Sequence, residues 1–211
     1  MRTRGRCLMS THDTIPAVPL HSIREVKPHT FIFEKARALP LDICAEMLRR
    51  FEDHKDEQYP GRIGQTAQED LSMKRSTDLV VSGKPHWQDI DRELFRSLGT
   101  AIREFRAAYP FFKGPFKDSG YAIQRTDPGG HYHWHIDGGS HEFSQRQLVA
   151  VWYLNDVTGP GGTTDFLYQN VRVRPEAGKL LLFPPFWTHE HRGATLQRGV
   201  KYIATTWVVF A

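Results

Sequence analysis

The sequence predicts an α+β domain that is mainly β, with the helices of its first half packed on one sheet. Three observations predict this class. Apolar residues repeat at helical spacing in the first half, the repeat changes from 3.6 to 2 after Tyr109 and Pro110, and glycine and proline then separate short apolar runs. Helices followed by many short strands are typical of a sandwich or barrel that carries helices on one sheet.

Two helices are expected in the first half. One starts at Leu41, directly after Pro40, and continues with apolar residues at helical spacing. The other spans about 87–108, where apolar residues mark one face, and the Tyr-Pro pair at 109–110 ends it. Both helices are therefore expected to be amphipathic and to bury one side.

Strands are expected on both sides of these helices. Short strands are predicted over 31–33 and 77–82, whereas the charged, turn-rich segment 53–75 forms either a lid or a disordered stretch. The strand-like runs of the second half are 121–125, 131–137, 148–154, 164–168, 171–173, 180–183, 189–191 and 202–210.

Composition limits the class of protein. The 211 residues include 28 Lys and Arg against 24 Asp and Glu, and because the basic residues are scattered we expect no nucleic-acid partner. No apolar run approaches the roughly 20 residues that span a bilayer, and no secretory signal is visible, so neither a membrane span nor secretion is expected. Cys7 and Cys44 are too few for a disulfide framework, which favours a cytoplasmic location. Residues 1–28 lack periodicity and are expected to be a poorly ordered lead-in to one domain over 29–211.

Histidines indicate where chemistry should be sought. Five of the 11 fall into two groups, at 131, 133 and 135 and at 189 and 191. Residues i and i+2 of a strand share a face about 6.6 Å apart, so His135 and Asp137 can reach one ion. A pair formed by His133 and His135 is geometrically as good, and either His189 or His191 can supply a third ligand. Two histidines and one carboxylate are the facial triad of non-haem Fe(II) oxygenases, whereas an all-histidine site favours zinc or copper.

Five motifs in the second half resemble, in order, those of the prolyl 4-hydroxylase-like branch of the 2-oxoglutarate/Fe(II) dioxygenases. The first is the Gly-x-Tyr-x-x-His-x-Asp pattern that starts at Gly130. The others are Trp152-Tyr153-Leu154-Asn155, Gly161-Gly162-Thr163-Thr164-Asp165-Phe166, the Gly178 to Pro184 stretch, and His191-Arg192-Gly193 followed by Gly199 to Trp207. The resemblance covers about 119–210.

The resemblance implies a double-stranded β-helix, or jelly roll, with Fe(II) held by His135, Asp137 and His191. It implies that Lys201, at 201 − 191 = 10 residues past the last ligand, binds the far carboxylate of 2-oxoglutarate. Tyr153 and Thr205 are the other residues implied for this cosubstrate. The family's usual tyrosine before the Pro-Gly turn is replaced by Thr126, so this chain completes the pocket differently.

The implied function is hydroxylation of an unactivated C–H bond by O2, with release of succinate and CO2 and with ascorbate as a candidate reductant. The expected partner is a prolyl or peptidyl side chain, an amino acid or another small molecule, because the motifs report cosubstrate binding and not substrate choice. Arg125 and Arg146 are candidates to bind a substrate carboxylate. The alternatives are a cupin-like module without oxygenase activity and a zinc site built on His133 and His135.

Overall fold

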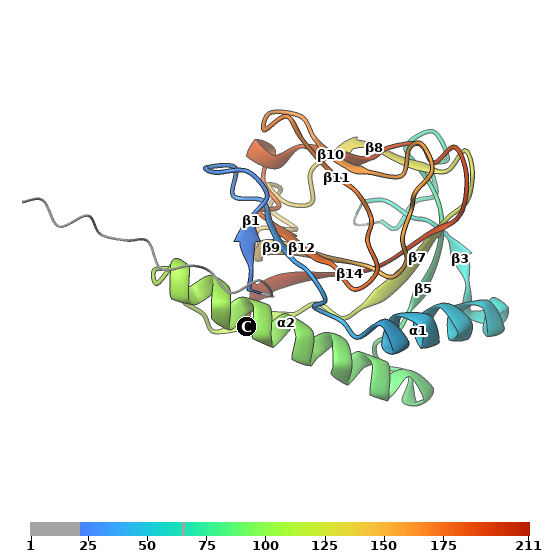
Figure 1. The fold of residues 1–211 in the computed structure, drawn as a ribbon, viewed down its shortest axis with the longest axis horizontal. Helices are drawn as coiled ribbons and strands as arrows, with labels where there is room; N and C mark the ends of the chain where they lie inside the picture. Colours follow the sequence, from blue (N-terminus) through green and yellow to red (C-terminus); the bar gives the residue numbers. More distant parts are fainter. Residues whose placement is uncertain (1–21, 65) are drawn as a thin grey trace, which may run out of the picture.

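The architecture is mainly β, as the sequence predicts, with antiparallel sheets and few helices (Figure 1). The computed structural model describes residues 22–64 and 66–211. Within these ranges the helices are α1 (Leu41–Asp53), α2 (Gln88–Ala108) and three short 3-10 turns, η1 (Lys55–Glu57), η2 (Pro85–Trp87) and η3 (Trp187–His189). No helix in the described ranges is long and apolar enough to cross a membrane.

The large sheet joins strands from every part of the chain. Its order is β1-β2-β12-β9-β14-β7-β5-β3, and β6 also pairs with β14. All of these pairings are antiparallel. The strands are β1 (Arg24–Glu25), β2 (Phe33–Lys35), β3 (Tyr59–Pro60), β5 (Thr77–Val80), β6 (Phe116–Asp118), β7 (Ala122–Thr126), β9 (Arg146–Tyr153), β12 (Leu180–Phe183) and β14 (Lys201–Phe210).

The small sheet has the order β11-β10-β13-β8-β4 and is also antiparallel. Its strands are β4 (Lys74–Arg75), β8 (His131–His135), β10 (Thr164–Phe166), β11 (Val171–Val173) and β13 (His191–Gly193). In Figure 1 the labelled strands β8, β10 and β11 lie on one side of the large sheet, and the two α-helices lie on the other.

Successive residues of β9 point alternately toward the helices and toward the interior between the two sheets. Leu148, Ala150 and Trp152 belong to the core cluster that includes buried residues of both α-helices. Val149 and Val151 belong to a second cluster, which also contains residues of the small sheet. Since successive side chains of a strand point to opposite faces, one strand serves both cores.

The long helix α2 buries a face that the sequence pattern predicts. Ile90, Leu94 and Leu98 are among its buried residues, but Phe95, which the apolar pattern also assigns to this face, is 61% exposed. A hydrogen-bond chain ties the helix to the sheet, because Trp152 Nε1 donates to Ser97 Oγ at 2.9 Å and Ser97 donates to the Ala38 carbonyl at 2.7 Å. The helix is thereby fixed against the centre of the large sheet.

Several element bounds differ from those expected. The strand expected over 31–33 lies at Phe33–Lys35, and segment 53–75 contains η1, β3 and β4 rather than forming one irregular stretch. Residues 187–189 form a 3-10 turn, so the last histidine strand begins at 191 and not at 189. Of the expected lead-in, residues 1–21 lie outside the described residues, and β1 lies within the remainder.

A β-bulge interrupts the pairing of β8 with β13. His191 pairs with His135, and Gly193 pairs with Tyr132, so three steps along β8 match two along β13. An extra residue in one strand breaks the simple alternation of faces and increases local twist. Tyr132 and His135 therefore share a side, and their rings stack with centroids 3.5 Å apart.

Candidate metal centre

Three side chains with metal-ligand chemistry meet beside the bulge. His135 ends β8, Asp137 follows it in the next loop, and His191 begins β13 as the cross-strand partner of His135. Nε2 of His191 lies 3.2 Å from Oδ2 of Asp137, and the ligand atoms of all three lie within 4.8 Å of one another. Bonds from a first-row metal to such ligands are about 2.0–2.2 Å long, so one ion can contact all three.

Backbone carbonyls fix the orientation of both imidazole rings. Nδ1 of His135 lies 2.7 Å from the His133 carbonyl, and Nδ1 of His191 lies 2.9 Å from the His189 carbonyl. A carbonyl only accepts, so each Nδ1 carries a proton, which leaves Nε2 of each ring as the atom that can bind a metal. Metal-binding histidines are usually oriented in this way.

The protonation states suit a cation. Burial, followed by the charge of His191, lowers the pKa of His135 to about 4, so its ring is neutral at pH 7. Burial by itself raises the pKa of Asp137, but the hydrogen bond from His191 and the nearby positive charges hold it well below its usual range. The site therefore offers a neutral imidazole at His135 and an ionised carboxylate at Asp137.

The loop that carries Asp137 is held by the chain that follows β12. The backbone N–H groups of Asp137 and Gly138 donate to the Pro185 carbonyl at 3.1 and 2.8 Å. Arg146 donates to the Asp137 carbonyl at 2.5 Å. These contacts bring Asp137 to the centre although β8 ends at residue 135.

A cavity of about 260 Å³ opens onto the three ligands. Lys201 and Thr205 lie on its wall, both from β14, and Gln124 of β7 lies beside Thr205 at 3.5 Å. The wall also includes apolar side chains of the large sheet, among them Val149, Val151 and Ile203. The cavity thus lies between the two sheets, on the face of the large sheet opposite the helices.

Lys201 is 5% exposed and lacks an ion-pair partner among the described residues. Its Nζ donates to the Gly162 carbonyl at 3.0 Å. Burial lowers the pKa of Lys201 to about 8, and the charge of Asp165 opposes this shift. Asp165 itself pairs with Arg172 and Arg192. A buried ammonium of this kind favours an anionic ligand, because burying a charge without a partner is costly.

Tyr153 lies one layer behind the cavity wall. It is fully buried, and its hydroxyl donates to Thr164 Oγ1 at 2.7 Å. Thr164 lines the cavity and Tyr153 does not. The structure therefore places Lys201 and Thr205 on the wall and Tyr153 in support of it.

The other three histidines of the two sequence groups, at 131, 133 and 189, are not among the candidate metal ligands. His189 is buried and contacts the Thr30 carbonyl at 2.9 Å, so it holds the loop before β2. His131 lines the cavity with Nε2 3.1 Å from the Ser72 carbonyl, whereas His133 is exposed and is not on the cavity wall. Among the described residues, no group of three or more candidate metal ligands includes His133, so a site built on His133 and His135 is not favoured.

The two candidate arginines have different surroundings. The Arg146 guanidinium lines the cavity between the rings of Phe143 and Trp207, 3.8 and 3.7 Å from their centroids. Arg125 instead pairs with Glu52 and Asp127, outside the cavity lining. Trp207 of β14 is part of the same cavity wall.

Sequence reasoning missed a buried ion pair beside the centre. Lys74 of β4 and Asp78 of β5 lie 2.6 Å apart, and their side chains are 5% and 7% exposed. Lys74 lines the cavity, and its ammonium lies 5.4 Å from the centroid of the Tyr132 ring. The Lys-x-x-x-Asp spacing is too common to mark this pair in a sequence.

Comparison with family models places this geometry in a known group. Residues 121–209, which carry the three ligands, the cavity wall of β14 and the bulge, match the model described as the 2OG-Fe(II) oxygenase superfamily. This segment of the chain is therefore similar to that superfamily, and the relatives and solved structures that match the chain include prolyl 4-hydroxylases.

Curated relatives match less than half of this chain, at low identity. The transmembrane prolyl 4-hydroxylase of Mus musculus is 28% identical, over 41% of this chain and 28% of the relative. A PKHD-type hydroxylase of Synechococcus sp. strain CC9902 is 26% identical, over 41% of this chain and 39% of the relative. The chain therefore spans well under half the length of either relative.

Solved oxygenase structures share the fold over most of the chain. A prolyl hydroxylase of Trichoplax adhaerens, in complex with a hypoxia-inducible-factor peptide fragment, has a TM-score of 0.73 at 15% identity, covering 86% of this chain and 84% of that one. A prolyl 4-hydroxylase of Pseudomonas putida has a TM-score of 0.64 at 20% identity, covering 85% and 92%. The oxygenase fold thus extends into the helices that precede the matched segment.

Proposed function

We propose that this chain is an Fe(II)- and 2-oxoglutarate-dependent dioxygenase that hydroxylates an unactivated C–H bond and releases succinate and CO2. The observation that carries the proposal is that one cavity contains both a two-histidine, one-carboxylate centre and a buried lysine without an anionic partner. The first suits Fe(II) with open coordination positions, and the second suits a dicarboxylate. We also propose that the two sheets form a double-stranded β-helix and that the domain spans 29–211.

His135, Asp137 and His191 would hold the iron. Their donor set fits because the backbone carbonyls occupy both Nδ1 atoms, which leaves both Nε2 atoms for the metal, and the carboxylate is ionised. When bound, the iron centre with 2-oxoglutarate and O2 supplies the oxidising chemistry, and the protein positions the substrate and excludes water. Ascorbate is the reductant we propose for keeping the metal in the Fe(II) state.

Lys201 would bind the far carboxylate of 2-oxoglutarate. In the absence of this ligand, its ammonium has only the Gly162 carbonyl as a close partner. Gly162 adopts φ +73°, and an added Cβ would lie 2.9 Å from Leu196 Cδ1, so glycine is required where this carbonyl turns inward. Thr205 would add a hydroxyl contact, and Tyr153 would act through Thr164.

The substrate we propose is a prolyl or other peptidyl side chain, or a free amino acid. Arg146 supports this class, because its guanidinium faces the cavity and can bind a backbone carbonyl or a carboxylate. Phe143 and Trp207 clamp it on both faces. Two of the structural neighbours are prolyl hydroxylases, one of them with a bound peptide. We propose a cytoplasmic location for the reaction.

The test is iron-dependent succinate formation. Protein purified without oxygen is supplied with Fe(II), 2-oxoglutarate, ascorbate and O2, and succinate is quantified for the wild type, His135→Ala and Lys201→Ala. We expect succinate in the wild type and its loss in both variants. His133→Ala is the matched control and should retain the wild-type rate, because His133 is exposed and absent from the cavity wall.

Uncoupled turnover without the true substrate is slow, so binding is measured as well. The Fe(II)·2-oxoglutarate complex has a weak visible charge-transfer band, which should appear anaerobically in the wild type and not in Asp137→Ala. Absence of both succinate and this band, with zinc retained through purification, would favour the alternative of a zinc-binding or cupin-like module. The comparisons do not favour that alternative.

A further inference from the structure

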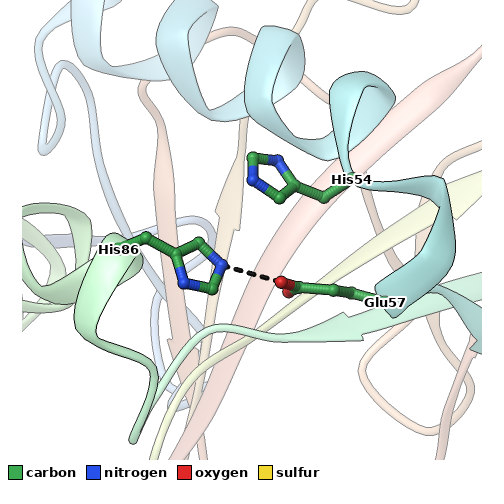
Figure 2. A group of neighbouring side chains, drawn as sticks. All are labelled: His54, Glu57 and His86. Atoms are coloured by element: carbon green, nitrogen blue, oxygen red, sulfur yellow. Dashed lines mark ion pairs between the residues drawn. The ribbon is translucent and has the colours of Figure 1, made fainter.

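A second group of metal-ligand side chains lies where α1 ends and α2 begins. His54 caps the C-terminus of α1, Glu57 ends η1, and His86 lies in η2 just before α2. Figure 2 shows the three side chains gathered in one place, with the carboxylate of Glu57 facing the ring of His86. Their ligand atoms all lie within 4.8 Å of one another, and none of the three lines the cavity around His135.

The nitrogen and oxygen atoms of this cluster that could bind a metal lie close to one another. Nδ1 of His54 lies 2.8 Å from the Arg50 carbonyl, so Nδ1 carries the proton and Nε2 keeps its lone pair. Nε2 of His86 lies 2.7 Å from Oε1 of Glu57. The two imidazole rings are nearly parallel, with centroids 5.1 Å apart and an interplanar angle of 16°. The ligand atoms thus lie close together, but the lone pairs of nearly parallel rings do not converge, so one imidazole must turn when an ion binds.

Neighbouring groups orient the carboxylate. Oε2 of Glu57 accepts hydrogen bonds from Lys84 Nζ at 2.5 Å and from Trp87 Nε1 at 3.4 Å, and Oε1 becomes the ligand once metal binding releases the proton that His86 Nε2 shares with it. Partners of this kind, which hold a ligand in place, are typical of metal sites. The positive charge of Lys84 opposes a cation, so the affinity should be lower than that of a closed structural zinc site.

We infer that His54, Glu57 and His86 bind a divalent transition-metal ion, for which Zn²⁺ is the best match. Zinc accepts imidazole nitrogen and carboxylate oxygen in tetrahedral geometry, and the exposed side of His86 leaves room for a water as the fourth ligand. Tetrahedral ligands lie about 3.3 Å apart, so the contact between His86 and Glu57 must open slightly. The bound ion would clip the end of α1 to the start of α2.

The bound ion would add to contacts that already join the end of α1 to the start of α2. Arg50 of α1 donates to the His86 carbonyl at 3.1 Å and pairs with Asp89 of α2 at 2.6 Å. These contacts hold the histidine and the two helix ends in place before any ion binds. Pre-organised ligands lose less conformational entropy on binding, which favours the site.

The test uses protein in which the iron centre has been removed. His135→Ala/Asp137→Ala is titrated with CoCl2, whose four-coordinate complexes absorb strongly in the visible range, and ZnCl2 is then added to displace the cobalt. We expect one Co²⁺ per chain with a four-coordinate spectrum, full displacement by Zn²⁺, and a rise of about 5 °C in melting temperature at saturating zinc.

Two sets of variants in the same background decide the outcome. His54→Gln/His86→Gln should abolish the cobalt spectrum, and Glu57→Gln should weaken binding about tenfold or more. His29→Gln/His141→Gln, which removes two exposed histidines elsewhere, should change neither. No cobalt spectrum in the background protein, or a spectrum that survives His54→Gln/His86→Gln, would overturn the inference. Either result leaves the oxygenase proposal untouched, because the iron centre is absent from every protein compared.

Discussion

Lys201 is the residue whose surroundings most restrict what the cavity can bind. Its ammonium is buried, its close partner is a neutral carbonyl, and the carboxylate that influences it, Asp165, is occupied by two arginines. An anion that enters the cavity gains an interaction that water does not screen. The charge state of this one side chain should therefore govern cosubstrate affinity.

The pKa of Lys201 predicts that the affinity for 2-oxoglutarate depends on pH. Because this pKa is about 8 without a ligand, the ammonium is present below pH 8 and is lost above it. The dissociation constant of 2-oxoglutarate should be flat near pH 7 and rise by up to about tenfold per pH unit above pH 8. It is measured anaerobically with Fe(II) between pH 7 and 9.5.

Lys201→Arg is the control for this dependence. A guanidinium stays protonated throughout the range, so the rise should vanish in this variant even if its affinity is lower at every pH. A rise that persists in Lys201→Arg would assign the titration to another group.

Tyr153 and Lys201 should differ in their effect on 2-oxoglutarate binding. Tyr153→Phe removes one neutral hydrogen bond to Thr164, behind the wall, and should weaken binding by less than about tenfold. Lys201→Met removes the charged partner and should weaken it by at least about tenfold. Both constants come from the same anaerobic titration, and equal losses would mean that the tyrosine contacts the cosubstrate directly.

At the scale of single elements, the bulge in β8 bears on a choice that the alternating sequence pattern leaves open, namely which neighbour of His135 joins it in the metal centre. Strict alternation puts His131, His133 and His135 on one face, and a pair of the last two is then as good as His135 with Asp137. The extra residue between Tyr132 and His135 turns His133 outward. A bulge depends on pairing with another strand, so the sequence of β8 alone does not reveal it.

The helix α2 offers a matched pair of substitutions. Leu94 is fully buried against the sheet, whereas its neighbour Phe95 is 61% exposed. Leu94→Ala should lower the free energy of unfolding by about 3 kcal/mol, because it leaves a cavity in the core. Phe95→Ala should change it by less than about 0.5 kcal/mol. Urea unfolding followed by circular dichroism measures both, and equal losses would contradict the packing described.

At the scale of the whole molecule, the Lys74–Asp78 pair joins the two sheets. Lys74 belongs to β4 in the small sheet and Asp78 to β5 in the large one, and both are buried. Ser76 completes the cluster by donating to Asp78 at 2.7 Å. A charge pair in this position stabilises the arrangement of the sheets only while both partners are present.

Asp78→Ala should therefore destabilise the protein strongly. The substitution leaves the Lys74 ammonium buried without its partner, and losses of about 3–5 kcal/mol in unfolding free energy are typical of such changes. Asp53→Ala, which removes one partner of an exposed pair with Arg49, should leave the urea midpoint unchanged within error. A small effect of Asp78→Ala would show that water reaches Lys74 readily.

Local sequence patterns predict much of the fold and part of the candidate metal centre. The order of helices and strands and the pairing of His135 with Asp137 follow from residues that are close together in the chain, whereas the choice of His191 over His189 rests on the family resemblance. The position of Tyr153 behind Thr164, the ion pair between β4 and β5, and the meeting of His54 with His86 depend on contacts between distant segments. Spacing in one sequence contains little information about such contacts.

The alternation along β9 has a consequence for how this protein can change. Odd-numbered positions such as 149 and 151 line the cavity, whereas even-numbered ones such as 148, 150 and 152 pack against the helix layer. Alternate residues of this one strand should therefore affect different properties: those on the cavity wall should affect substrate range, and those that face the helices should affect thermal stability. A library that randomises only the odd positions should yield altered specificity in chains that still fold, and directed evolution can exploit that separation.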